Sequence, residues 1–347
     1  MRGSTADDAL IRSRSGKRIS VTHRNGVVIR TPSLSISLDP RRAPNSDYTF
    51  VSHAHIDHIH SPDGASKIIA SKETGVLAKA RGYDFESVQE NVPGIDLTDA
   101  GHILGSRAVL IEDSVFYTGD YSTRDRGFLK GSPGVKCDTL IMETTYGNPK
   151  YKFTETEKIV SSVSKLIADC FDKCRPVVLT GYPLGKAQLI TYLFRNWEPI
   201  FLHESVHKMN EAHIDLGVEI PRLALCGTGA TQKSLLKRLP WIMISPASTG
   251  RSQFIKSLRE NYGAVVIAFT GWAVSPRYRY MMGVDYAFDL SDHCDFNELV
   301  SLAKYCNPSK VYTVHGFSTE FAEHLKFLGF DAEPLEGAEQ STLTNYA

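Results

Sequence analysis

The chain has 347 residues, of which 42% are hydrophobic and 22% are charged. This composition is ordinary for a globular protein and excludes a disordered or fibrous chain. The 39 basic and 39 acidic residues give a formal net charge of zero, so the chain as a whole has no strong attraction for nucleic acid or an anionic membrane, although a local basic groove is allowed. The length indicates one large domain or two intertwined domains.

The cysteines and the apolar runs bear on location. Six cysteines are scattered without a C-x-x-C pair, which argues against a disulfide framework and a thiolate zinc site and fits a reducing interior. No apolar run approaches the ~20 residues of a membrane span, and the first residues contain no apolar signal core. We therefore expect a cytoplasmic protein without a membrane partner; whether the initial MRGS is native stays open.

In chain order, the residues before about 150 predict mainly short strands. Strands are expected within residues 21–30, 34–40, 47–53, 107–113, 114–122 and 137–147, and a helix within 70–82. A helical period then begins at 154–173, where Thr154 and Glu157 have the spacing of a capping box.

Strand–turn–helix units follow in residues 175–196, 199–217 and 241–261. These units predict a parallel α/β layer. Further strands are expected in 265–273, 285–293 and 310–316, and helices in 296–306 and 319–329. We read a β-rich body, residues 1–158, that is interrupted by an α/β insert at 159–274 and resumed at 275–347.

The segment VSHAHIDH concentrates metal-binding side chains after an expected strand. It places His53, His55, Asp57 and His58 within six residues. Four imidazole and carboxylate ligands at this spacing can serve two adjacent metal ions. A polar surface turn is the alternative, and two later residues disfavour it. His102 in AGHILGS and Asp120 in YTGDYS each add one candidate ligand beside a glycine, near the end of an expected strand.

This pattern, H-x-H-x-D-H followed by one histidine and one strand-end aspartate, resembles the metallo-β-lactamase fold, an αββα sandwich. The resemblance implies two zinc ions per chain, with manganese or iron as alternatives for a site rich in histidine and aspartate. His53, His55 and His102 would hold one zinc, Asp57 and His58 the second, and Asp120 would bridge them. Asp39 in SISLDP matches the family's early aspartate, which orients the histidine loop.

Three further residues resemble the motifs of the β-CASP nucleases within this fold. They are Glu143 in METTYG, His293 in LSDHCD and His315 in TVHG, and the last two are 22 residues apart. By this resemblance His315 completes the second zinc site and His293 is the general acid, with Glu143 holding its imidazole. Asp57, Glu143 and His293 are thus the residues expected to act in catalysis. The insert at 159–274 would be the β-CASP cap domain.

The resemblance also indicates where a substrate would bind. Backbone amides and hydroxyls at strand-to-helix turns are good phosphate donors, although ordinary helix caps are the alternative reading. Local basic clusters, such as Arg277 and Arg279 among tyrosines, fit a basic groove better than a generally adhesive surface. The expected phosphate contacts are Thr180, Gly181, Tyr182, Lys186, Ser245, Ser248 and Thr249.

The implied function is hydrolysis of phosphodiester bonds in single-stranded RNA or DNA by a zinc-dependent nuclease. The closest likeness is to compact prokaryotic proteins of the mRNA 3′-end-processing type, including DNA-ligase-associated exonucleases. An exonuclease in RNA processing or DNA repair is therefore expected. Hydrolysis of a lactam or thioester is a rival reading, which leaves the 116 residues at 159–274 without a purpose. A non-catalytic RNA-binding scaffold is a second rival. The presence of all seven candidate metal ligands argues against it. RNA against DNA, polarity, and monomer against homodimer stay open.

Overall fold

The structure is a computed structural model that describes residues 9–12, 18–23, 25–60, 66–226, 236–238, 240–248 and 250–335. Its described residues form two compact units. The first comprises the described residues up to 124, residues 131–149 and residues 293–335. The second comprises residues 125–130 and 150–292. Each unit is a separate α/β structure, which confirms the predicted fold class.

The first unit contains two sheets. One has the order β1-β2-β3-β4-β5-β6-β7, antiparallel as far as β4 and parallel from β4 to β7. Its strands are β1 (Ala9–Arg12), β2 (Arg18–His23), β3 (Val27–Arg30), β4 (Ser35–Leu38), β5 (Tyr48–Phe50), β6 (Lys67–Ile69) and β7 (Val88–Gln89). The other has the order β19-β18-β11-β10-β9-β8. Its strands are β8 (Ile95–Asp99), β9 (Arg107–Ile111), β10 (Val115–Tyr117), β11 (Thr139–Glu143), β18 (Lys310–Val314) and β19 (Ala332–Pro334).

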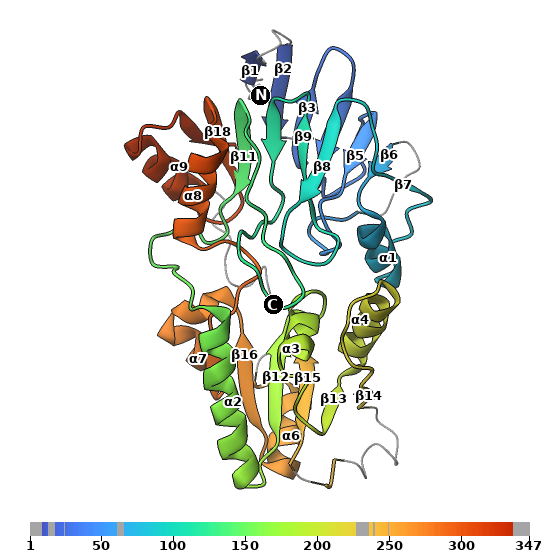
Figure 1. The fold of residues 1–347 in the computed structure, drawn as a ribbon, viewed down its shortest axis with the longest axis vertical. Helices are drawn as coiled ribbons and strands as arrows, with labels where there is room; N and C mark the ends of the chain where they lie inside the picture. Colours follow the sequence, from blue (N-terminus) through green and yellow to red (C-terminus); the bar gives the residue numbers. More distant parts are fainter. Residues whose placement is uncertain are drawn as a thin grey trace, which may run out of the picture. The chain divides into compact units, whose positions relative to one another are not determined.

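The two sheets pack face to face. Apolar side chains of both form one core, with Ile29 and Phe50 from the first sheet and Val109 and Ile141 from the second. A second core lies on the other face of the second sheet, which α8 (Phe296–Cys306) and α9 (Ser318–Phe327) cover (Figure 1). Helix α1 (Lys72–Ala80) connects the parallel strands β6 and β7. This is the predicted sandwich, because each sheet has one apolar face for the other.

One predicted strand is in fact a hairpin. Residues 21–30 were expected to be continuous, but β2 and β3 are separate antiparallel strands. Asn25 and Gly26 between them have φ values of 59° and 99°, in the left-handed region that tight hairpin turns require. An Asn-Gly pair between apolar runs is the usual sequence signal for such a turn.

The second unit is built on one parallel sheet, with the order β14-β13-β15-β12-β16-β17. The strands are β12 (Val177–Gly181), β13 (Ile200–Leu202), β14 (Ala224–Leu225), β15 (Ile242–Pro246), β16 (Val265–Phe269) and β17 (Tyr286–Phe288). Alternate residues of each strand enter different cores: Val177 and Leu179 point to one face and Val178 to the other. The sheet is therefore buried on both sides, as parallel sheets are.

Helices cover both faces of this sheet (Figure 1). Helices α2 (Thr156–Asp172), α3 (Lys186–Leu193) and α4 (Glu204–Asp215) contribute to one core. Helices α6 (Gln253–Tyr262) and α7 (Pro276–Met282), with the short 3₁₀ turn η1 (Gly271–Val274), contribute to the other. The predicted capping box of α2 is wrong, because its N-cap is Glu155, which makes no side-chain cap bond. The backbone amide of Thr154 donates to Asp289 instead.

The boundaries between the two compact units differ from the predicted domain boundaries at 158/159 and 274/275. Strand β17 pairs with β16, so residues 275–292 belong with the parallel sheet rather than with the returning half of the sandwich. The predicted boundaries stay a prediction about the inserted domain. Among the described helices, none is both long and apolar enough to cross a membrane.

Candidate metal centre

The candidate ligands follow the carboxyl ends of strands in the first unit. Strands β8, β10, β11 and β18 run in one direction and only β9 of these neighbours opposes them, so their ends share one edge of the sheet. At this edge lie His102 after β8, Asp120 after β10, Glu143 at the end of β11 and His315 after β18. The segment 53–58 follows β5 of the facing sheet. Residues far apart in sequence thus come from neighbouring strand ends.

Four imidazole rings converge on one oxygen of Asp120. The Nε2 atoms lie 3.5 Å (His53), 3.5 Å (His58), 3.6 Å (His102) and 4.0 Å (His293) from Asp120 Oδ2. Nε2 of His53 is buried and makes no hydrogen bond to any described residue. An orphaned imidazole nitrogen beside a buried carboxylate is costly unless another group binds there.

Asp39 and Ser52 fix the direction of two of these rings. Asp39 Oδ2 accepts from His58 Nδ1 at 2.9 Å and from the Tyr117 hydroxyl at 2.9 Å, while Ser52 donates its amide to Oδ1 and its hydroxyl to Oδ2, both at 2.7 Å. The Ser52 hydroxyl also lies 2.9 Å from His53 Nδ1. Because both Nδ1 atoms are engaged, the Nε2 atoms of the two rings face Asp120. This is the outer-shell arrangement typical of metal-binding histidines.

The buried Glu143 and the partly buried His293 form a pair beside this cluster. His293 Nδ1 lies 2.9 Å from Glu143 Oε1, which also accepts from the Tyr121 amide at 2.8 Å. Glu143 Oε2 accepts from the Thr145 amide at 3.2 Å. Burial alone would raise the pKa of Glu143, but His293 and these hydrogen bonds outweigh it and lower the pKa. The carboxylate is therefore ionised and can only accept, so Nδ1 carries the proton in this bond.

The remaining predicted ligands lie next to His58. Asp57 Oδ2 is 3.7 Å from His58 Nε2, and the His315 ring centroid is 5.7 Å from that of His58. The close-packed groups of candidate ligands are His53, His55, His102 and Asp120, and Asp120, Glu143 and His293. The predicted second set of Asp57, His58, Asp120 and His315 is thus adjacent to the first but looser, and its role stays a prediction.

Burial and neighbouring charges shift the pKa values of the groups around Asp120. Burial raises the pKa of Asp120 to about 6, although His58 and His293 act in the opposite direction. Burial and the neighbouring imidazoles hold the pKa of His53 well below its ordinary value. Burial would also lower the pKa of His58, but Asp120, Asp57 and Asp39 together raise it well above its ordinary value. A divalent cation would favour the ionised carboxylate and the neutral imidazoles, which are the ligand forms.

The residues present fit a metal ion. Three imidazoles with a carboxylate are a donor set that zinc accepts, and His55 Nδ1 lies 3.2 Å from His102 Nε2 within the same cluster. Ring orientation by Asp39 and the orphaned nitrogen of His53 point to the same conclusion. The cluster therefore fits a metal site.

The predicted phosphate contacts lie in the second unit, at the carboxyl ends of β12 and β15. Thr180 and Ser245 are paired across these strands and are buried. Thr180 donates its hydroxyl to Ile267 O, whereas the buried Oγ atoms of Ser245 and Ser248 have no hydrogen-bond partner among the described residues. Tyr182 is half-buried, and Thr249 lies outside the described residues. Their role in substrate binding stays a prediction.

The predicted phosphate contacts Gly181 and Lys186 are both buried, unlike an exposed phosphate ligand. The lysine is almost fully buried, and its amine donates to Leu290 O at 2.8 Å and pairs with Asp292. The amine is thus held by the protein itself.

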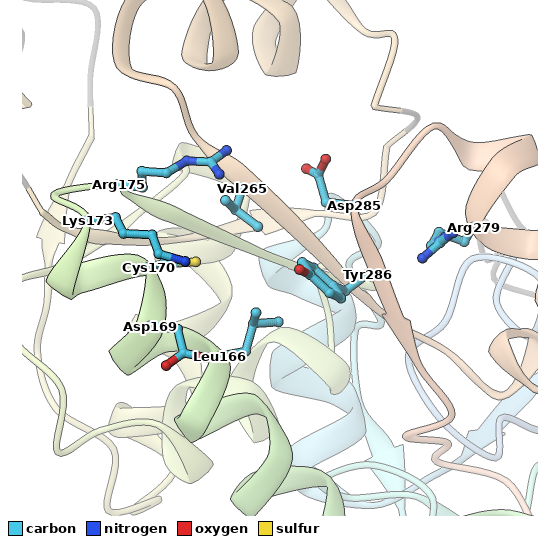
Figure 2. Close-up of a pocket in the computed structure, with 9 residues that line it drawn as sticks. All are labelled: Leu166, Asp169, Cys170, Lys173, Arg175, Val265, Arg279, Asp285 and Tyr286. Atoms are coloured by element: carbon cyan, nitrogen blue, oxygen red, sulfur yellow. The ribbon is translucent and has the colours of Figure 1, made fainter.

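A cavity of about 300 Å³ lies elsewhere in the second unit. Figure 2 shows its lining, which comes from α2 and the segment after it, the start of β16, α7 and the start of β17. Both cationic and carboxylate side chains line it, and the Asp285 carboxylate is already bonded to Arg259 and to the Val266 amide. None of the predicted site residues lines this cavity.

Comparison with known proteins identifies the family. Residues 282–333 match the family described as a Zn-dependent metallo-hydrolase RNA specificity domain. A protein of Opitutus terrae named "Probable DNA ligase" is 32% identical over 300 residues, which cover 82% of this chain and 28% of that protein. An "RNase J-like protein" of Methanocaldococcus jannaschii is 25% identical over 184 residues, 44% of each chain. The "DNA cross-link repair 1A protein" of Mus musculus is 24% identical over 294 residues, 76% of this chain and 28% of that protein.

The chain belongs to the β-CASP branch of the metallo-β-lactamase fold. It spans less than half the length of each of these three curated relatives. A solved structure of a protein of unknown function from Enterococcus faecalis V583 has the same fold, with a TM-score of 0.63 and 15% identity over 94% of this chain and 99% of that one. The family assignment confirms the resemblance read from the histidine cluster and from Glu143, His293 and His315.

Sequence reasoning missed several residues around this β-CASP centre. Ser52 and Tyr117 complete the hydrogen bonding of Asp39, and Arg126 donates to Ser291 O two residues before His293. Ser52 could have been found, because it directly precedes the first ligand. Tyr117 and Arg126 carry no local signal, since their partners are distant in sequence.

Proposed function

We propose that this chain is a zinc-dependent nuclease that hydrolyses phosphodiester bonds of single-stranded nucleic acid, with two metal ions bound at the cluster. The observation that carries the proposal is the convergence of four imidazole Nε2 atoms on Asp120, with one of those imidazoles held by Glu143. A purely structural histidine cluster would not need a carboxylate-bound imidazole at its edge. The names of the relatives, which include an RNase J-like protein and a DNA cross-link repair protein, support a nucleic-acid substrate.

The ligands fall into two sets in this proposal. His53, His55, His102 and Asp120 would hold one ion, and Asp57, His58, Asp120 and His315 the other. When bound, two zinc ions supply a nucleophile at neutral pH and neutralise charge on the phosphate oxygens.

The chain's own residues orient and move protons. Asp39 holds His58 at Nδ1, which keeps its Nε2 toward Asp120. Glu143 holds His293 at Nδ1 in the same way and stabilises the protonated ring. The proton on His293 Nε2 is then the one given to the departing 3′-oxygen, and the product carries a 5′-phosphate.

The test uses matched single-stranded RNA and DNA, each labelled at either end, with zinc or manganese supplied. A ladder of products from one end, terminating in 5′-phosphates, is expected for an exonuclease, and the preferred sugar identifies the substrate. The Asp120→Ala protein is the control for a contaminating nuclease. If metal binds and neither strand is cleaved, the proposal is wrong and hydrolysis of a small molecule becomes the better account.

A further inference from the structure

Lys186 occupies an unusual place for a lysine of a nucleic-acid enzyme. Its side chain is 4% exposed, and its amine donates to Leu290 O at 2.8 Å and pairs with Asp292, whose side chain is also nearly buried. Lysines are almost never buried unless they are paired. The pair therefore serves a purpose inside the protein.

Gly181 makes room for this lysine. A Cβ at Gly181 would lie 2.6 Å from Lys186 Cγ and 2.8 Å from Ile190 Cδ1, closer than carbon atoms approach. The glycine at the end of β12 thus lets the lysine stem lie across the strand. From sequence, the same residue was expected to contact a phosphate, and the packing gives a different reason for its lack of a side chain.

A second buried cation binds the same segment. Arg126 is 1% exposed, and its Nη1 donates to Ser291 O at 3.1 Å. Reciprocal backbone hydrogen bonds of 2.8 Å between Arg126 and Leu129 fix the turn that carries it. Leu290, Ser291 and Asp292 are therefore held one after another by two buried cations.

The next residue in the chain is His293. Its carbonyl accepts from Arg124 Nη2 at 3.2 Å, and the Cys294 amide donates to Tyr121 O at 2.7 Å. The backbone is therefore anchored at His293 and at the residue that follows it. A ring whose backbone is fixed in this way loses little freedom when Nδ1 bonds Glu143.

We propose that Lys186 and Arg126 are positioning residues for His293: they fix residues 290–292 and, through the peptide bond to His293, restrict the backbone that carries the imidazole bonded to Glu143. The proposal rests on the proposed function of His293 as proton donor. It assigns Lys186 no contact with substrate.

The two roles of Lys186 have different consequences. A phosphate-binding lysine contributes to affinity, so its loss raises KM and weakens the salt dependence of binding. A positioning lysine acts on proton donation, so its loss lowers kcat and leaves KM unchanged. The loss also depends on the leaving group, because a p-nitrophenolate departs without a proton and a sugar alkoxide does not.

The experiment compares a single-stranded oligonucleotide with bis(p-nitrophenyl) phosphate in the metal-loaded full chain. In Lys186→Met we expect kcat on the oligonucleotide to fall about 10²-fold, the general-acid contribution, with KM and the rate on the aryl ester changed by less than about threefold. Lys186→Arg, which keeps the cation, recovers part of the loss. Gly181→Ala displaces the lysine stem without removing its charge and reproduces the loss. The control is Lys158→Met, an exposed lysine of α2 in the same unit, which leaves every rate unchanged.

A second readout does not depend on activity. The His293 Nδ1 proton bonded to Glu143 should give a downfield proton resonance, assigned by its absence in His293→Gln. In Lys186→Met and in Arg126→Met this resonance is expected to be lost or to shift upfield. An unchanged resonance in both folded variants overturns the proposal, as does an equal loss of both activities or a rise in KM alone. If the wild-type protein cleaves neither substrate, the proposed nuclease function is wrong, and the resonance still decides the positioning role.

Discussion

Replacing Asp39 by asparagine isolates the orientation of the ligands from the ligands themselves. Asp39 follows β4 with a φ of 44°, a conformation that asparagine adopts as readily as aspartate, so the backbone should be retained. The carboxylate accepts four hydrogen bonds: from the Ser52 amide, the Ser52 hydroxyl, the Tyr117 hydroxyl and His58 Nδ1. An asparagine side chain offers one oxygen and turns an N–H₂ group toward a donor.

The magnitude follows from these bonds. When the amide nitrogen takes the place of Oδ2, the hydroxyls of Ser52 and Tyr117 can rotate and accept from it, whereas His58 Nδ1 loses its acceptor and becomes an unsatisfied buried donor, a loss of about 1.5–3 kcal/mol. The free energy of unfolding should therefore fall by about 1.5–3 kcal/mol. Because His58 loses its orientation, affinity for zinc should fall about 10- to 100-fold.

Zinc affinity is measured by calorimetric titration of the metal-free protein in the presence of a competing chelator, and stability by urea unfolding. Asp113→Asn is the matched control, since Asp113 also has a positive φ of 51° but is exposed, and it should change neither quantity. Wild-type zinc affinity in folded Asp39→Asn would refute the orientation of His58 by Asp39.

Three further predictions concern other residues. Asp120→Ala should abolish strand cleavage without changing the circular dichroism of the fold, and full turnover would contradict the two-metal assignment. Burial lowers the pKa of His213 from 6.5 to about 4. Between these two pH values the imidazole is protonated in the unfolded chain but neutral in the folded chain. Its contribution to stability is thus present above pH 6.5 and lost as the pH falls toward 4, by about 3 kcal/mol in total; in urea unfolding, His213→Leu should lack this loss, and an unchanged pH dependence would contradict it. Gly316→Ala should lower the unfolding free energy by about 1–3 kcal/mol, since Gly316 has a φ of 59° and a Cβ there would lie 2.5 Å from Thr144 O; unchanged urea unfolding would count against that strain.

The metal cluster could be predicted from sequence because its chemistry is concentrated locally. Four candidate ligands lie within residues 53–58, and the others follow apolar strand segments whose ends meet at one sheet edge. The strand and helix patterns predicted a β-rich body with an α/β insert for the same reason, since periodicity is a property of adjacent residues. The αββα sandwich itself was implied by the family resemblance.

Features that depend on distant partners could not be predicted. Lys186 follows a strand and a glycine whether it contacts a phosphate or pairs with Asp292, and only the folded chain distinguishes the two. Strand β17 belongs with the parallel sheet because it pairs with β16, which no local pattern reveals. The Asn25–Gly26 turn is different: its signal was present in the sequence and was overlooked.

The most direct test of a two-metal nuclease is to restore activity by titrating zinc into the metal-free protein. Cleavage of a labelled single strand is measured alongside bound zinc at each addition. We predict no cleavage without metal, and a rate that reaches its plateau only when two ions are bound per chain. Cleavage by the metal-free protein, or a plateau at one ion, would contradict the account.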